Sequence, residues 1–268
     1  MSTTGKQWVL GTYVDSTLTN FGGIPYGTKI ARNATNTKEP GSGQRKLASI
    51  DTSGVYYVID FKLKVTNLST FIIGKCFVTA EGALPSFNLY GYDGITKKGF
   101  TGCLVNTCKL SVGQTGALTA DIQVIALATE DKDLTTPLPT EAPMTKAAVT
   151  TLSVGGTSIV KWQKLSFSIN NNVEVIATGN GVAMTEIYAQ QAEYDGDLTF
   201  AKTAELTYGY STDVTKDIII TLTDNQSSPS TKTFTFDDAR ANSNEYSVDE
   251  LKLTYESITW DGDELAIT

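Results

Sequence analysis

Long runs of alternating apolar and polar residues most constrain the fold of this chain. The clearest run has apolar residues at odd positions and polar or charged residues at many of the even ones: Val55, Tyr57, Ile59, Phe61, Leu63 and Val65 against Asp60, Lys62 and Lys64. A period of two residues is typical of a β-strand with one buried face, because successive side chains point to opposite sides. The pattern therefore predicts a long strand over residues 55–65.

A second strand, expected within residues 157–172, changes its parity part of the way along. Its apolar residues are first even-numbered and then odd-numbered: Val160, Trp162, Leu165, Phe167 and Ile169. One strand buries both sets on the same face only if an extra residue is inserted, which predicts a β-bulge near Gln163 and Lys164. The alternative is a strand with different partners on its two faces.

The same alternation predicts two long hairpins. The first covers residues 98–128, and the second covers residues 146–170 around the Gly155-Gly156 turn. Residues 69–80 are apolar without a clean period and fit either a buried strand or a short helix. The expected fold is all-β, an antiparallel β-sandwich or barrel subunit with long hairpins and at most one or two short helices.

The chain divides into two parts by composition. Residues 1–53 are rich in Gly, Thr, Asn and Pro, which predicts an irregular N-terminal arm that either lies on the domain or orders against a neighbouring subunit. Residues 54–268 are expected to form one β domain. It has two possible pseudo-repeated halves, 54–128 and 144–268, and a linker near residues 129–143 that contains three of the seven prolines.

Charge and residue usage narrow the possible functions. The 268 residues carry a formal net charge of −8, which disfavours tight binding of nucleic-acid phosphates. The chain has no His, so the commonest general base and metal ligand is missing. A catalytic pair of carboxylates, as in glycosidases, needs no His, but no segment of the sequence indicates such a pair. We therefore expect no enzyme and no catalytic residue.

No cofactor or metal site is expected either. The three Cys residues lack Cys-x-x-Cys spacing and are interpreted as buried thiols. Asp195-Gly196-Asp197 and Asp261-Gly262-Asp263-Glu264 are only fragments of a calcium loop, and turn formation explains them. No apolar run has the length of a signal peptide or of a membrane span. The expectation is a protein made in the cytoplasm with no membrane partner.

Four segments resemble the tail tube proteins of long-tailed phages and archaeal tailed viruses. In the first half these are GALPSFNL at residues 82–89 and GFTGCLVNTCKLSV at residues 99–112. In the second half they are LSFSINNN at residues 165–172 and YDGDLTF at residues 194–200. The similarity extends over about residues 82–223.

The resemblance implies a structural virion protein whose subunits form closed, hexameric rings that stack into a tail tube. DNA would pass through the lumen without specific binding, and the other partners would be the tape measure, the tail terminator and, in a contractile tail, the sheath. The two predicted hairpins would line the lumen or contact other subunits through Thr119, Asp121, Gln123, Lys161, Gln163, Ser166, Ser168 and Asn170. The alternative function is a β-sandwich binding or adhesion module of a viral or cell-surface assembly.

Overall fold

The computed structural model describes residues 9–40, 47–76, 83–92, 97–134, 142–176, 186–201, 214–247 and 255–268. The first half contains β1 (Val9–Val14), β2 (Thr17–Asn20), β3 (Gly23–Pro40), β4 (Leu47–Val65), η1 (Ile72–Lys75), β5 (Phe87–Tyr92), β6 (Lys97–Gly113), β7 (Thr119–Ala126) and β8 (Ala128–Asp131). The second half contains η2 (Lys146–Ala148), β9 (Val149–Val154), β10 (Thr157–Ser158), β11 (Trp162–Asn170), β12 (Glu174–Ile176), β13 (Glu186–Tyr188), β14 (Glu193–Ala201), β15 (Thr215–Thr223), β16 (Thr231–Ser247), β17 (Tyr255–Gly262) and β18 (Glu264–Ile267). The predicted all-β fold is confirmed, and both helical segments are short 3-10 turns.

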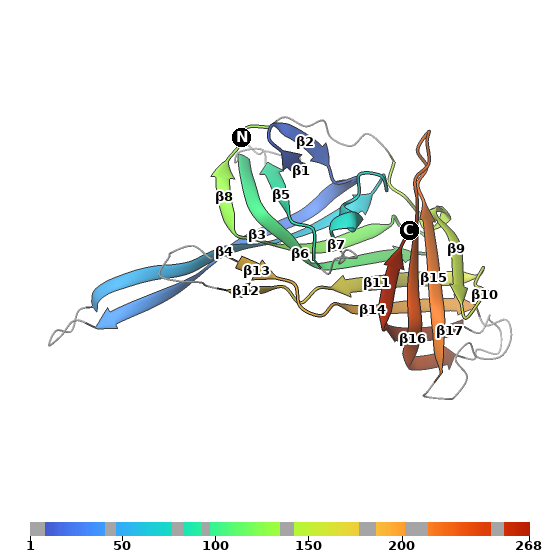
Figure 1. Cartoon of the computed structure of the whole chain (residues 1–268). Coiled ribbons are helices and arrows are strands. Elements are labelled where there is room, and N and C mark those ends of the chain that lie inside the picture. Colours follow the sequence, from blue (N-terminus) through green and yellow to red (C-terminus); the bar gives the residue numbers. More distant parts are fainter. Residues whose placement is uncertain are drawn as a thin grey trace.

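Eight strands form one continuous sheet, which we call the main sheet. Its order is β3-β4-β7-β6-β11-β14-β17-β16, and every neighbouring pair is antiparallel. Figure 1 shows β11 and β14 side by side beneath the strands of the first half, and the far part of the β3–β4 hairpin projecting beyond them. The apolar residues of the alternating strands share one face of the main sheet and are buried there.

Two smaller layers cover this apolar face, one over each half of the main sheet. The first contains β1, β2, β5, β8 and the beginning of β6, and Phe21 stacks on Phe61 with ring centroids 5.2 Å apart. The second contains β9, β10, β15, β18 and the beginning of β16, and Phe167 packs against Phe234 at 4.9 Å and Phe236 at 5.6 Å. The side chains between the layers form the hydrophobic core.

The two halves share one topology. In the main sheet the first half has the order β3-β4-β7-β6 and the second β11-β14-β17-β16, so both place their strands in the order first, second, fourth, third. In each half the third strand has 17 residues, enters from the covering layer and then joins the main sheet. A four-residue strand, β8 or β18, follows the fourth strand and pairs back on the third.

Two β-bulges occupy equivalent positions in the halves. The register shifts at Tyr26 in β3 and at Gln163 in β11, which are the first strands of the two halves. It shifts again at Asn106 in β6 and at Asn242 in β16, which are the third strands. The predicted bulge near Gln163 is thus confirmed, and it explains the change of parity.

Residues 9–40 differ from the irregular arm that we expected for residues 1–53. They form β1, β2 and β3, and the expected boundary at residue 54 falls within β4. Gly22 lies in the turn between β2 and β3, where it has a φ of 67° and would clash with Asn67 if it carried a Cβ, and Pro25 and Gly27 flank the register shift in β3. Residues 1–8 and 41–46 of the arm lie outside the described residues.

The hairpin predicted for residues 98–128 is confirmed as β6–β7, whereas that for residues 146–170 is wrong. After the Gly155-Gly156 turn, only Thr157 and Ser158 pair back on β9. The chain then crosses to the main sheet, where β11 pairs with β6 and β14.

In the apolar segment at residues 69–80, the helical alternative applies to Ile72–Lys75, and residues 77–80 lie outside the described residues. Of the linker expected near residues 129–143, residues 128–131 form β8 and residues 135–141 lie outside the described residues.

Two buried polar side chains join the halves. Asp224 accepts hydrogen bonds from the backbone N–H groups of Leu68 (2.9 Å) and Ser230 (3.0 Å). Asn171 donates from Nδ2 to the carbonyl oxygens of Cys76 and Val105, both at 2.9 Å. Both are almost fully buried, so each satisfies backbone groups that water does not reach.

The three thiols are expected to resist chemical labelling in the folded protein. Cys76, Cys103 and Cys108 are all buried in the first half, and burial raises the pKa of Cys103 from its ordinary 9.0 to about 12. We expect no reaction with Ellman's reagent at pH 8 and reaction of all three thiols in denaturant. Between pH 9 and 12 only the unfolded chain ionises Cys103, so the free energy of unfolding falls as the pH rises through this range. Rapid labelling without denaturant would contradict the buried arrangement.

Candidate functional surface

The face of the main sheet opposite the core carries rows of polar side chains, and we call it the polar face. One row crosses six strands in register and consists of Lys62, Asp121, Lys109, Ser168, Asp195 and Asp261. A second row consists of Asp60, Gln123, Thr107, Asn170 and Glu193, and a third of Thr119, Ser111, Ser166, Asp197, Thr259 and Ser243. The rows result from the strand period, since residues opposite each other in antiparallel strands share a face.

Side-chain contacts connect the strands of the first half across this face. Lys62 Nζ lies 3.0 Å from Asp121 Oδ2, and this hydrogen bond raises the pKa of Lys62. Gln123 donates from Nε2 to Asp60 Oδ1 (2.7 Å) and accepts at Oε1 from Asn106 Nδ2 (2.6 Å). Three strands, β4, β7 and β6, are thereby linked by side chains in addition to their backbone ladders.

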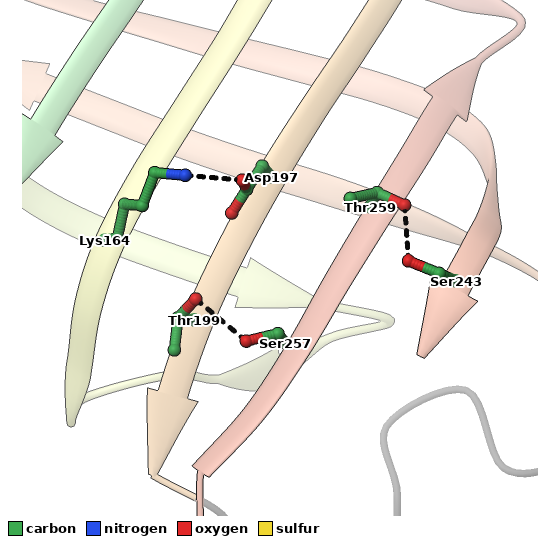
Figure 2. Close-up of polar contacts among 6 residues, drawn as sticks. All are labelled: Lys164, Asp197, Thr199, Ser243, Ser257 and Thr259. Carbon is green, nitrogen blue, oxygen red and sulfur yellow. Dashed lines mark hydrogen bonds and ion pairs between the residues drawn. The ribbon is translucent and has the colours of Figure 1, made fainter. Parts of the chain in front are cut away.

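The second half carries an equivalent set of contacts, shown in Figure 2. Lys164 Nζ on β11 lies 2.6 Å from Asp197 Oδ2 on β14. Hydroxyl pairs follow on the next strands, Thr199 with Ser257 at 3.0 Å and Ser243 with Thr259 at 2.8 Å. These contacts link β11 to β14, β14 to β17 and β17 to β16 by side chains in addition to their backbone ladders.

The polar face carries charges of both signs. Its described basic residues are Lys29, Lys62, Lys64, Lys109, Lys164 and Arg240, and its described acidic residues are Asp60, Asp121, Glu193, Asp195, Asp197, Glu245 and Asp261. The strands of the first half carry most of the lysines, and those of the second half most of the carboxylates. An anionic polymer that approaches this face therefore meets no continuous basic patch.

The polar face is hollowed over the middle of the main sheet. A shallow depression of ≈ 700 Å³ extends from Gly27 and Lys29 on β3 to Asp195 on β14, and it crosses β4, β7, β6 and β11. A sheet that curves toward its polar side in this way has the curvature of a segment of a cylinder wall seen from the inside.

Six of the eight residues predicted for this surface lie on the polar face. Thr119, Asp121 and Gln123 come from β7, and Ser166, Ser168 and Asn170 come from β11; β6 lies between the two strands. The other two, Lys161 and Gln163, line a separate depression of ≈ 270 Å³ beside Trp162. They are separated from the six because Lys161 precedes β11 and Gln163 is the bulged residue.

Sequence reasoning missed the partners of these residues on the neighbouring strands. Lys62 and Lys109 flank Asp121, and Asp195 accepts a hydrogen bond from Ser168 Oγ at 2.6 Å. Lys62 stands out in the sequence as a charged residue opposite a run of apolar ones. The register that brings it to Asp121 has no signal in the sequence of either strand.

Within the described residues, no group of three or more His, Cys, Asp or Glu is placed to hold a metal ion. None of the helical segments in that part of the chain is long and apolar enough to cross a membrane. The polar face presents ion pairs, hydroxyl pairs and amides on an antiparallel sheet.

A family model described as phage tail tube protein matches residues 11–262. The match includes both halves of the main sheet and nearly all of both covering layers. No curated protein matches the chain.

Proposed function

This chain belongs to the phage tail tube protein family, and on that premise we propose that it assembles into closed rings that stack into a tail tube, with the polar face turned to the lumen. As a tail tube protein it has a structural role in the virion tail. The tube forms the conduit through which the genome enters the host, and DNA passes along the polar face without specific binding.

The observation that carries this proposal is the concave polar face. A tube wall needs one water-exposed surface toward the lumen and one covered by protein, and the main sheet has its core only on one side. A tube also needs sheet edges that pair between subunits, because an unpaired edge is an aggregation site. Ring closure satisfies both requirements at once.

The charge pattern of the polar face suits transport of DNA. Phosphates bind strongly where several Lys or Arg side chains are free, and the affinity then falls with salt. Here Lys62 and Lys164 are each paired with an Asp carboxylate, so neither offers a free ammonium group. DNA is expected to slide past this wall because the lysines of the first half have carboxylates beside them and the second half is mostly acidic.

Other tail components complete the assembly. The tape measure protein occupies the lumen before ejection, the tail terminator closes the upper end, and a sheath surrounds the tube if the tail is contractile. The covering layers face outward in this arrangement, where they are accessible to a sheath or to solvent.

Electron microscopy of the purified chain at rising concentration tests the assembly. Hollow tubes or rings of uniform diameter are the expected result. Particles that remain monomeric at every concentration, and that also fail to extend purified tail tips, would overturn the proposal.

Reversal of one charge on the polar face is expected to slow DNA exit. Asp121→Lys would place a new ammonium group between Lys62 and Lys109 and create a basic patch in every subunit. In virions that carry this variant, ejection measured by a DNA-binding dye should slow severalfold at low salt and recover at high salt. The matched control is Glu264→Lys on β18, an exposed acidic residue of a covering layer. Equal ejection rates for the two variants at low salt would place Asp121 outside the lumen.

A further inference from the structure

We propose that duplex DNA in the lumen travels along one half of the polar face and keeps away from the other. The favoured half is the polar face of β3, β4, β7 and β6, which we call the first-half stripe. The avoided half is the polar face of β11, β14, β17 and β16, the second-half stripe. The inference rests on the proposed tube function and adds to it the part of the wall that the phosphates face.

The two stripes carry opposite net charges. Among the described residues, the first-half stripe has four lysines and two aspartates, an excess of two positive charges. In the same part of the chain, the second-half stripe has two basic and five acidic residues, an excess of three negative charges. The charged residues of the first are Lys29, Asp60, Lys62, Lys64, Lys109 and Asp121, and those of the second are Lys164, Glu193, Asp195, Asp197, Arg240, Glu245 and Asp261. A phosphate group is therefore attracted to one stripe and repelled by the other.

The first-half stripe has more ammonium groups than carboxylates to pair with them. Asp121 lies between Lys62 and Lys109 in register, so one carboxylate serves two lysines. Its Oδ2 is 3.0 Å from Lys62 Nζ, and Lys109 has no ion pair within the part of the chain that the structure describes. Lys64 Nζ lies over the ring of Tyr26, 5.9 Å from its centroid, and not beside a carboxylate. Positive charge is therefore left over for DNA phosphates.

The carboxylates of the second-half stripe have neutral donors instead. Ser168 Oγ donates to Asp195 Oδ2 at 2.6 Å, and Asn170 Nδ2 donates to Glu193 Oε2 at 3.2 Å. A hydroxyl or amide donor orients a carboxylate but leaves its charge in place. Asp195 and Asp261 also lie opposite each other on β14 and β17. This stripe therefore presents negative charge that a phosphate must avoid.

The shape of the wall favours the same half. The depression in the polar face is lined by residues of all four strands of the first-half stripe, but only by residues 168–170 of β11 and Asp195 of β14 in the second. The sugar-phosphate backbone of a duplex is a convex ridge, and it fits a hollow better than a flat surface. Charge and shape are independent observations, and both place the DNA over the first-half stripe.

The width of the stripes decides whether DNA distinguishes them. Four strands at a spacing of about 4.8 Å cover about 19 Å. The Debye length is about 8 Å in about 0.15 M salt, so a phosphate near one stripe experiences mainly the charges of that stripe. In about 0.01 M salt the Debye length of about 30 Å merges the two fields, and in about 1 M salt both are screened. The preference should therefore be largest near physiological salt.

Photochemical cross-linking from two matched positions tests this preference. Thr119 on β7 and Thr259 on β17 are half-buried residues of the same type in one row of the polar face, four strands apart. Each is replaced by Cys, and the unassembled chain is labelled with a thiol-reactive aryl azide. The native thiols are buried and do not take up the label. The labelled chains are assembled into tubes, incubated with a short fluorescent DNA duplex, illuminated and separated by denaturing electrophoresis.

The expected result in about 0.15 M salt is at least about threefold more cross-linked DNA from Thr119→Cys than from Thr259→Cys. The difference should disappear in about 1 M salt. Adding Asp195→Asn and Asp261→Asn to the Thr259→Cys chain should raise its yield, because two of the repelling charges are then removed.

Equal yields from the two positions in about 0.15 M salt, or a larger yield from Thr259→Cys, would overturn the preference and leave DNA passage through the lumen standing. Ala266→Cys, at an exposed position of β18 in a covering layer, is the control for DNA bound outside the tube. A yield from Ala266→Cys as large as those from both polar-face positions would remove the proposed lumen itself.

Discussion

Gly196→Ile is expected to destabilise the protein by more than about 3 kcal/mol, because a large indole occupies the space beside this glycine. A Cβ at Gly196 would lie 2.0 Å from Cζ2 of Trp260, which is fully buried and packs edge-on against Phe236 at 6.1 Å. The indole therefore has no open space into which it could move. The measurement is the midpoint and slope of denaturant unfolding.

The residues at the equivalent positions of the first half suggest a second substitution that should restore the lost stability. Ile59 and Val124 are paired in register where the second half has Gly196 and Trp260. Trp260→Val alone should cost about 3 kcal/mol through the cavity that it leaves. The double variant Gly196→Ile with Trp260→Val should be more stable than either single one, with a coupling of about 2 kcal/mol.

The control for the glycine substitution is Gly113→Ala. Gly113 is also at a strand position of the main sheet, but no heavy atom lies within 4 Å of a Cβ built there. Its expected effect is below about 1 kcal/mol. If the Gly196→Ile and Gly113→Ala variants had the same free energy of unfolding, this result would contradict the close packing of Trp260 against Gly196.

Asp224→Ala is expected to cost about 3 kcal/mol, because buried backbone N–H groups lose their acceptor. Its carboxylate accepts from Leu68 on Oδ2 and from Ser230 and Gln226 on Oδ1, so it joins the loop after β4 to the β15–β16 turn. The loss should appear in denaturant unfolding as a lower midpoint.

The variant Asp224→Asn distinguishes the contribution of the hydrogen bonds to stability from the contribution of side-chain packing. It has nearly the same shape and keeps one acceptor oxygen, so we expect roughly half of the loss seen with alanine. An alanine variant as stable as the natural chain would show that water reaches these N–H groups and that Asp224 does not join the two halves.

The alternation of apolar and polar residues predicted the strands of this protein well where one face of the strand is buried and the other is exposed. Residues 55–65 and the β6–β7 hairpin show it most clearly, and the change of parity before Leu165 located a bulge. The same pattern predicted six residues of the polar face, because a strand with its apolar side in the core must turn its polar side outward.

The pairing of strands that lie far apart in the chain gave no comparable signal in the sequence. The Gly155-Gly156 turn suggested a long hairpin, yet β11 pairs with β6, whose residues lie 51 (Lys164 to Gly113) to 63 (Asn170 to Thr107) positions earlier in the sequence. Strands β1 to β3 were missed because their Gly and Pro residues interrupt the apolar–polar period in the sequence. The sequence suggested two pseudo-repeated halves, 54–128 and 144–268, but not which residues correspond. The halves share strand order and bulges, while the residues at equivalent positions, such as Ile59 and Gly196, differ in size.

The covalent connection between the halves has a consequence for how fast a ring forms from a dilute pool of subunits. β8 ends at Asp131 and β9 begins at Val149, so the short segment between them holds the two halves at an effective concentration on the order of millimolar. The β6–β11 contact therefore forms within one chain before any two chains meet. In the proposed ring, linked halves need half as many intermolecular encounters as separate halves would need. The rate of ring closure should therefore rise less steeply with subunit concentration than it would for separate halves.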